Sequence, residues 1–249
     1  MADFEQARLL GLGALGTGSG IGTLSERSLH AVFKFWFDAC EEHHEVRLPC
    51  GAVADIFDGE RVTEIQTAGF SRFRGKLLRL LEQYPVTVVY PITRVKYLSW
   101  IDPDTGESTP PRKAPRRGNF ADIGRELIYL LPALGHPGLT FVLQLVDVEE
   151  YRLRDGWGSG GKRGAHRAER LPVAEGERLT VRCVADWCGV LPPDLPSLFT
   201  VADVQKAARL SPRKASTLIN TLYKIGVIIR AGKHGNAFLY EKAADARDA

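Results

Sequence analysis

The alternation of apolar and polar positions predicts a helix near the start of the chain. Apolar residues recur at helical spacing from Leu29 to about Cys40. The preceding Thr23-Leu24-Ser25-Glu26 reads as a capping box, in which Thr23 caps the helix and Glu26 occupies its third position. We therefore expect a helix that begins at Thr23 and packs its apolar face on a core.

Three short strands, a second helix and a buried strand are predicted next. Segments 45–48, 51–57 and 61–67 have strand character, and Asp58-Gly59 between the last two is a strong hairpin signal. An amphipathic helix then runs from Phe70 to Tyr84, and the apolar run from Val86 to Pro91 is typical of a buried strand. The element order is α-β-β-β-α-β.

The C-terminal fifty residues have a different character. Thr200 is suited to cap a short helix, and Ser211-Pro212 to start a second one that Gly226 ends. Two short strands at 227–231 and 237–241, joined by a basic turn, complete the order helix, turn, helix, hairpin. This is the layout of a winged helix-turn-helix.

The segments between these elements set the expected domain boundaries. We expect a flexible Gly-rich arm at 1–22, an α/β domain at 23–150, a basic Gly-rich loop and connector at 151–198, the winged helix at 199–242 and a tail at 243–249. The arm formally contains the glycine fingerprint of dinucleotide-binding folds, but no strand precedes it. Within 23–150 we also expect a helix that Asn119 starts and a strand at 139–148.

Composition excludes several classes of protein. The chain has 249 residues, 44% of them hydrophobic and 25% charged, without a run of apolar residues long enough to span a membrane or a secretory signal. The four cysteines lack the paired spacing of a zinc site and are expected to be buried thiols. We expect a cytoplasmic protein without a membrane partner.

Charge is unevenly distributed although the net charge is only +3. Segments 108–118, 151–170 and 199–249 carry +4, +4 and +5, which leaves −10 on the rest of the chain. Basic segments beside an acidic body suit a polyanion, with nucleic acid as the leading candidate. The alternative is that these segments are simply well-solvated loops.

Polar residues interrupt the two strands of the predicted hairpin. Asp55 lies within an apolar strand, and Glu64 and Gln66, two residues apart, leave the same face of the next strand. The hairpin allows Asp55 and Glu64 to lie side by side, where two carboxylates repel unless a cation lies between them. Oxygen ligands favour Mg²⁺ or Mn²⁺. Alternatively, Asp55 accepts hydrogen bonds in a turn, and Glu64 and Gln66 lie on a solvent-facing edge.

These residues resemble the core of the PD-(D/E)XK nuclease superfamily, which has a restriction-endonuclease-like α-β-β-β-α-β fold. Glu26, Asp55 and Glu64-Ile65-Gln66 match its acid on the first helix, its strand Asp and its Glu-x-Lys, with Gln66 in place of the lysine. The stretches GTLSERSLH, VADI, VTEIQT and VVYP are also similar to uncharacterised Gram-positive bacterial proteins that carry a C-terminal winged helix.

The resemblance implies a role for each matching residue. Asp55, Glu64 and the main-chain carbonyl of Ile65 would bind Mg²⁺ or Mn²⁺, with Glu26 completing the site, and Gln66 would orient the attacking water. Glu26 also has the simpler role of a capping residue. Gln66 cannot supply positive charge, and Lys76 on the following helix is a possible substitute. However, Lys76 shares a face with Arg72 and Arg79 opposite the apolar face, which favours a solvated stripe.

The predicted winged helix offers a surface for reading DNA. Its second helix exposes residues suited to base edges or to phosphate, and the turn between its strands adds two basic residues. The candidates are Arg213, Lys214, Ser216, Thr217, Asn220, Lys233 and His234. The same surface could instead bind a protein.

Together these features predict an α/β protein with a restriction-endonuclease-like core and added elements, followed by a small winged-helix domain. We expect a metal-dependent DNA endonuclease. The resemblance further implies a homodimer, because cutting both strands with one such site usually needs two copies. The alternatives are a DNA-binding protein that has lost turnover with the lysine, and a nuclease that acts on RNA or on branched structures.

Overall fold

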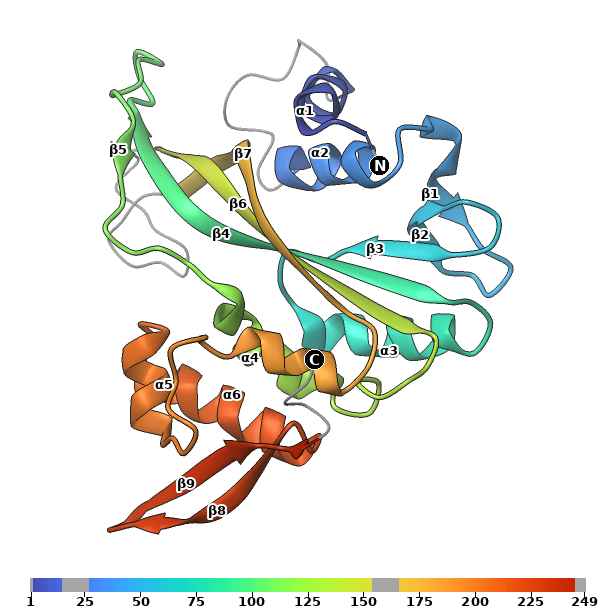
Figure 1. The fold of residues 1–249 in the computed structure, drawn as a ribbon. Helices are drawn as coiled ribbons and strands as arrows, with labels where there is room; N and C mark the ends of the chain where they lie inside the picture. Colours follow the sequence, from blue (N-terminus) through green and yellow to red (C-terminus); the bar gives the residue numbers. More distant parts are fainter. Residues whose placement is uncertain (1, 15–26, 154–165, 245–249) are drawn as a thin grey trace. The chain divides into compact units, whose positions relative to one another are not determined.

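The computed structural model describes residues 2–14, 27–153 and 166–244 of the chain, which form a mixed α/β fold (Figure 1). The α-helices are α1 (Phe4–Gly13), α2 (Arg27–Phe37), α3 (Phe70–Leu81), α4 (Gly124–Leu127), α5 (Val201–Ala207) and α6 (Pro212–Lys224). Short 3-10 segments lie at Glu41–His43, Phe120–Ile123, Ile128–Leu130 and Ala185–Val190.

The strands form one larger sheet and one small one. They are β1 (His44–Arg47), β2 (Val53–Phe57), β3 (Val62–Ile65), β4 (Val86–Ile101), β5 (Arg112–Lys113), β6 (Leu139–Leu153), β7 (His166–Val181), β8 (Ile228–His234) and β9 (Ala237–Lys242). The larger sheet has the order β1-β2-β3-β4-β6-β7, with β5 paired to β4, and β8 and β9 pair separately. The expected α/β class is therefore confirmed.

Contacts divide the chain into two compact units. The first contains residues 1–46, 93–118 and 145–177, and the second contains residues 47–92, 119–144 and 178–249. The long strands β4, β6 and β7 pass through both units. The predicted core strands β2 and β3 therefore share the second unit with the C-terminal helices and hairpin.

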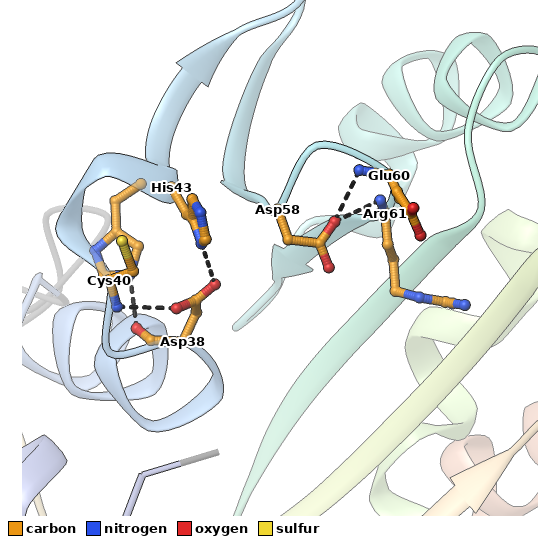
Figure 2. A network of polar contacts seen from close by, with 7 residues as sticks. Asp38, Cys40, His43, Asp58, Glu60 and Arg61 are labelled. Carbon is orange, nitrogen blue, oxygen red and sulfur yellow. Dashed lines mark hydrogen bonds and ion pairs between the residues drawn. The ribbon is translucent and has the colours of Figure 1, made fainter.

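The β2–β3 hairpin of the second unit forms at Asp58-Gly59, as the sequence predicts. The Asp58 carboxylate accepts hydrogen bonds from the backbone N–H groups of Glu60 (2.9 Å) and Arg61 (2.7 Å), as Figure 2 shows. Gly59 has a φ of 98°, a left-handed conformation that glycine adopts without strain. Antiparallel pairing then places Phe57 opposite Val62 and Ile56 opposite Thr63. This turn fixes which residues of the two strands face each other.

Helix α3 connects β3 to β4, which are parallel neighbours with Glu64 opposite Val88. The apolar face of α3 is buried through Phe70, Phe73, Leu77, Leu80 and Leu81. Burial of such a face, at roughly 1.5–3 kcal/mol for each large side chain, holds the helix on the sheet. Strand, helix and parallel strand therefore follow the predicted order here.

The N-terminal segment of the first unit differs from the flexible arm expected at 1–22, because Phe4–Gly13 is a helix. The side chain of Asp3 caps this helix by accepting hydrogen bonds from the N–H groups of Glu5 and Gln6. The ring of Phe4 packs edge-on against that of Trp36 of α2, with 4.8 Å between the ring centroids. Gly11 permits the contact, since a Cβ there would lie 2.6 Å from the Cα of Val32. Gly11 therefore serves close packing rather than flexibility. The rest of the expected arm, with Thr23 and Glu26, lies outside the described residues.

The end of α2 is fixed by a local side-chain contact. The helix ends at Phe37, and the next residue, Asp38, accepts a hydrogen bond from the N–H of Cys40 (2.9 Å) and pairs with Nδ1 of His43 (2.7 Å), as Figure 2 shows. The backbone then enters the short 3-10 segment and β1. The predicted strand at 45–48 is therefore confirmed, one residue earlier.

The connector expected at 151–198 is largely strand and 3-10 helix rather than loop. Strand β6 continues to Leu153, and β7 occupies His166–Val181. The charged residues of this part hid its strand character. In the structure Arg178 of β7 donates to the side-chain oxygen of Gln144 of β6 at 2.6 Å, and charged residues of the neighbouring strands β4 and β6 pair with one another. Arg94 makes two contacts with Asp147, at 2.7 and 2.9 Å, and Glu150 binds both Lys96 and Arg152 at 2.7 Å. Residues 154–165 of the predicted loop lie outside the described part.

The predicted helix that starts at Asn119 is broken into short pieces. Asn119 does start the segment, in a capping box with Asp122, but α4 covers only Gly124–Leu127 and is flanked by 3-10 segments. Gly124 touches α6, since a Cβ there would lie 2.6 Å from the Cβ of Leu218. The side-chain N–H of Asn119 also donates to the carbonyl of Ala208 at 2.9 Å. This segment therefore attaches the C-terminal helices to the rest of the second unit.

The C-terminal module, defined here as residues 199–242, has the predicted order of elements. Thr200 forms a capping box with Asp203, Pro212 occupies the first turn of α6, and Gly226 follows α6 with a φ of 81°. Strands β8 and β9 form an antiparallel hairpin that Figure 1 shows at the C-terminal, red end of the colour scale.

Two further expectations concern the whole described chain. All four cysteines are free thiols, as expected, but Cys40 and Cys183 are exposed and only Cys188 is buried. Among the helices of the described residues, none has the length and apolar character needed to cross a membrane.

Candidate functional site

The hairpin brings Asp55 and Glu64 together in the second unit. Strands β2 and β3 pair Ile56 with Thr63, and extending this register by one residue places Asp55 of β2 opposite Glu64 of β3. The backbone N–H of Ile65 donates to Oδ2 of Asp55 at 2.7 Å. The two acids that the sequence singles out therefore lie side by side on neighbouring strands.

Glu64 is fully buried, with 0% of its surface exposed. Its Oε2 accepts from Nζ of Lys76 at 2.6 Å and, over a long contact of 3.4 Å, from Nε2 of Gln66. Its Oε1 has no hydrogen-bond partner among the described residues. A buried carboxylate oxygen without a partner costs free energy.

The electrostatics of Glu64 reflect this environment. Burial is the largest of the causes that raise the pKa of Glu64, and the negative charge of Asp55 raises it further. Lys76 lowers it, and the pKa that results is about 7. Near neutral pH the carboxyl group is therefore poised between its two protonation states. Such a shift in a group that faces a second acid is typical of functional sites.

Two of the alternatives for these residues fail in the structure. Strand β3 lies between β2 and β4, so Glu64 is not on a solvent-facing edge. Lys76 does not belong to a solvated stripe: its ammonium reaches inward to Glu64, whereas Arg72 and Arg79 are exposed. Helical periodicity assigns a residue to a face, but it does not reveal that a long side chain at the margin of that face can reach a buried acid.

Glu126 is a residue that sequence reasoning missed. Helix α3 begins after Gly69, which has no side chain to cap it, and Oε2 of Glu126 accepts from the N–H of Phe70 at 2.9 Å. A carboxylate at a helix N-terminus is favourable because it satisfies an unpaired N–H and opposes the helix dipole. Since the two residues are 56 positions apart, no local pattern could have found this cap.

The donor set is suited to a small divalent cation. Mg²⁺ is commonly held by one or two carboxylates together with water and substrate oxygens, and Asp55, Glu64 and the Ile65 carbonyl would supply oxygen ligands. The orphaned Oε1 of Glu64 fits this interpretation. In the described part of the chain no group of three or more His, Cys, Asp or Glu side chains is arranged so that it could hold a metal ion. Glu26, the third expected acid, lies outside the described residues.

The candidate nucleic-acid residues lie where the sequence places them, on α6 and at the tip of the β8–β9 hairpin. Arg213, Ser216, Asn220, Lys233 and His234 are exposed. Two others have protein partners: the hydroxyl of Thr217 donates to the carbonyl of Arg213 at 2.9 Å, and Lys214 lies 3.5 Å from Asp122. These contacts leave the surface basic, because the described part contains no carboxylate paired with Arg213 or Lys233.

An aromatic and cationic cluster on the same module was not expected. The Arg230 guanidinium lies over the ring of Phe238 at 4.1 Å and over that of Tyr223 at 4.5 Å. Lys233 lies over the same Phe238 ring at 4.8 Å. Tyr223 and Phe238 are each 37% exposed although they are large and aromatic. The bulge in the hairpin between Arg230 and Gly232 is not visible in the sequence, so the facing residues could not be matched beforehand.

Comparison with known proteins gives a family but no activity. A family model described as a domain of unknown function (DUF8091) matches residues 27–182, more than half of the chain. This range includes Asp55, Glu64 and Lys76. An uncharacterised protein of Treponema pallidum (strain Nichols) is 28% identical over 231 residues, which cover 89% of this chain and 87% of the relative. No solved structure matches the chain.

Proposed function

We propose that the chain, which belongs to the family described as a domain of unknown function (DUF8091), is a metal-dependent endonuclease that hydrolyses phosphodiester bonds in DNA. The observation that carries this proposal is the buried Glu64, which faces Asp55, contacts Lys76 and has one carboxylate oxygen without a partner. In this proposal the surrounding strands and α3 form a restriction-endonuclease-like core.

The residues of the site divide the chemistry among themselves. Asp55, Glu64 and the Ile65 carbonyl would hold Mg²⁺ or Mn²⁺, which supplies Lewis-acid stabilisation of phosphate charge and acidifies a water molecule. Gln66 holds the Glu64 carboxylate through its amide and can also orient water. Lys76 would provide the positive charge that Gln66 cannot, and its ammonium would be a donor for a phosphate oxygen.

The C-terminal module would position the substrate as a winged helix. Its exposed Ser216 and Asn220 are suited to base edges, whereas Arg213 and the hairpin residues Lys233 and His234 are suited to phosphates. Since one site of this kind cuts one strand, we propose that a homodimer cuts both. Binding through these cations predicts a strong dependence of affinity on salt.

A second candidate is a DNA-binding protein without turnover. The observation that favours it is the 2.6 Å contact between Lys76 and Glu64, because an internal cation then neutralises the acid in place of a metal. In that case Lys76 is a structural partner, and removing Asp55 or Glu64 leaves DNA binding unchanged or tighter as acid repulsion falls.

Cleavage of supercoiled plasmid with Mg²⁺, and separately with Mn²⁺, tests the proposal. The wild type and the control Glu82→Gln, which alters an exposed acid after α3, are expected to cut. Asp55→Asn, Glu64→Gln and Lys76→Gln are expected to lose activity by at least about a hundredfold. If no variant differs from the wild type, the activity lies elsewhere or in a contaminant. If the wild type binds plasmid but does not cut it with either metal, the binding protein is the correct account.

A further inference from the structure

A polar groove of about 300 Å³ lies on the C-terminal module beside α6. Its polar lining consists of Ser216, Thr217 and Asn220 from α6 and Arg230 from β8, and its apolar lining includes Ile219 and Tyr240. The volume is at the lower end of the range for sites that enclose a small ligand. A concave site of this size fits one small ligand rather than the continuous surface of a DNA duplex.

Arg230 is held in place before any ligand arrives. Its guanidinium lies over the rings of Phe238 and Tyr223 at 4.1 and 4.5 Å, and no described carboxylate or carbonyl accepts from it. Cation–π contacts of this kind fix the plane of the group and leave its N–H edge for an anion. An arginine restrained by two rings loses little side-chain entropy when it binds phosphate.

The remaining lining matches the other parts of a nucleotide. Asn220 carries both a donor and an acceptor, the pattern that hydrogen-bonds to a base edge. Ser216 adds a hydroxyl, and Thr217, whose hydroxyl donates to the Arg213 carbonyl, can still accept. Ile219 and Tyr240 form the apolar floor of the groove and are themselves buried, with 1% and 6% of their surface exposed.

From this arrangement we propose that the groove binds one unpaired nucleotide, with its phosphate on Arg230 and its base edge on Asn220. The inference rests on the proposed action on DNA and deepens it: the preferred substrate carries an unpaired nucleotide, such as a bulge or a gap, rather than uniform duplex. The same chemistry could also come from a free nucleotide, and the test separates the two sources.

The test is an anisotropy titration of labelled DNA with the whole chain in EDTA, so that no cleavage occurs. A perfect duplex is compared with the same duplex carrying one unpaired nucleotide, using the wild type, Asn220→Ala, Arg230→Lys and the control Lys224→Ala. Lys224 is exposed on the same helix and does not line the groove. Unlabelled deoxynucleoside monophosphate is then added as a competitor.

We expect the wild type and Lys224→Ala to bind the unpaired substrate about tenfold more tightly than duplex. Asn220→Ala and Arg230→Lys should both lose this preference, and Arg230→Lys should keep its duplex affinity because it retains the charge but not the planar fork. Competition by the monophosphate that depends on Asn220 assigns the groove to a free nucleotide, and absence of competition assigns it to one within a strand. Equal affinity for both DNAs together with no competition overturns the inference.

This outcome can be separated from failure of the proposed activity. A protein that cuts plasmid without a preference for the unpaired substrate refutes the groove alone. A protein that shows the preference but does not cut with either metal refutes the nuclease alone.

Discussion

Replacing Glu64 with glutamine should make the protein more stable at alkaline pH than the wild type. The substitution keeps the size of the side chain and an acceptor oxygen, and it removes the charge that is buried beside Asp55. Lys76 loses its partner, but its side chain is 27% exposed and can be hydrated. A site whose residues are arranged for function rather than stability is expected to respond in this way.

The magnitude follows from the pKa of Glu64, which is raised from its ordinary 4.5 to about 7 by burial first and by Asp55 second. At about 1.4 kcal/mol per pH unit, this difference corresponds to about 3 kcal/mol of unfolding free energy. Because the folded-state pKa is the higher one, the wild type has its full stability below pH 4.5. It loses this contribution as the pH rises through about 7.

The assay is denaturant unfolding in EDTA for the wild type, Glu64→Gln and Glu82→Gln. It is repeated at several pH values between 4.5 and about 7 and at higher pH. The difference between Glu64→Gln and the wild type should grow by up to about 3 kcal/mol from acid to alkaline pH, while Glu82→Gln should follow the wild type. Lys76→Gln should shift the loss to higher pH, because the Lys76 ammonium lowers the pKa of Glu64. Parallel pH profiles for the wild type and Glu64→Gln would refute the reasoning.

Further predictions concern packing, capping, ion pairing and pH dependence. In thermal unfolding, Gly124→Ala should lower stability by about 1–3 kcal/mol, because the new Cβ would lie 2.6 Å from the Cβ of Leu218. The matched control is Gly75→Ala on α3, where a Cβ meets no atom within 4 Å. It should instead stabilise the protein by up to about 1 kcal/mol. Glu126→Ala should cost about 1 kcal/mol through loss of the α3 cap, and an unchanged midpoint of chemical unfolding would contradict this role. Asp147→Ala should lower the free energy of unfolding by about 2 kcal/mol at neutral pH. Burial alone would raise the pKa of Asp147, but Arg94 lowers it overall. The wild type should therefore lose this stability only when the pH falls below the usual carboxyl value of 3.8 and the carboxylate is protonated. Cleavage at limiting Mg²⁺ should rise between about pH 6 and 8, since a cation binds the ionised form of Glu64, and a flat profile would count against this metal ligand.

The sequence predicts the hairpin and its two acids because their signals are local. Asp58-Gly59 sets the turn, strand alternation assigns Glu64 and Gln66 to one face, and pairing across a short turn leaves little choice of partner for Asp55. The α3 helix and the order of elements in the C-terminal module are predicted for the same reason, since periodicity and capping act within a few residues.

The features that sequence reasoning missed depend on distant partners. Helix α1 contains glycines that suggested flexibility, but Gly11 is required by the close approach of α2. Strand β7 carries charged residues, among them Arg178, whose guanidinium donates to Gln144 of the neighbouring strand β6. Lys76 and Glu126 act across tertiary contacts that no spacing in the sequence encodes. In each case the residue's role is determined by a residue that is distant in the sequence but adjacent in the fold, and the local sequence pattern does not reveal it.

Binding of Mn²⁺ tests the central claim most directly, because the claim places a divalent cation between Asp55 and Glu64. Electron paramagnetic resonance of a Mn²⁺ titration at alkaline pH reports the metal that stays free in the presence of the protein. The account predicts one site per chain in the wild type, its loss in Glu64→Gln, and binding at least as tight in Lys76→Gln, whose lysine no longer competes for the carboxylate. No binding by the wild type, or equal binding by Glu64→Gln, would contradict it.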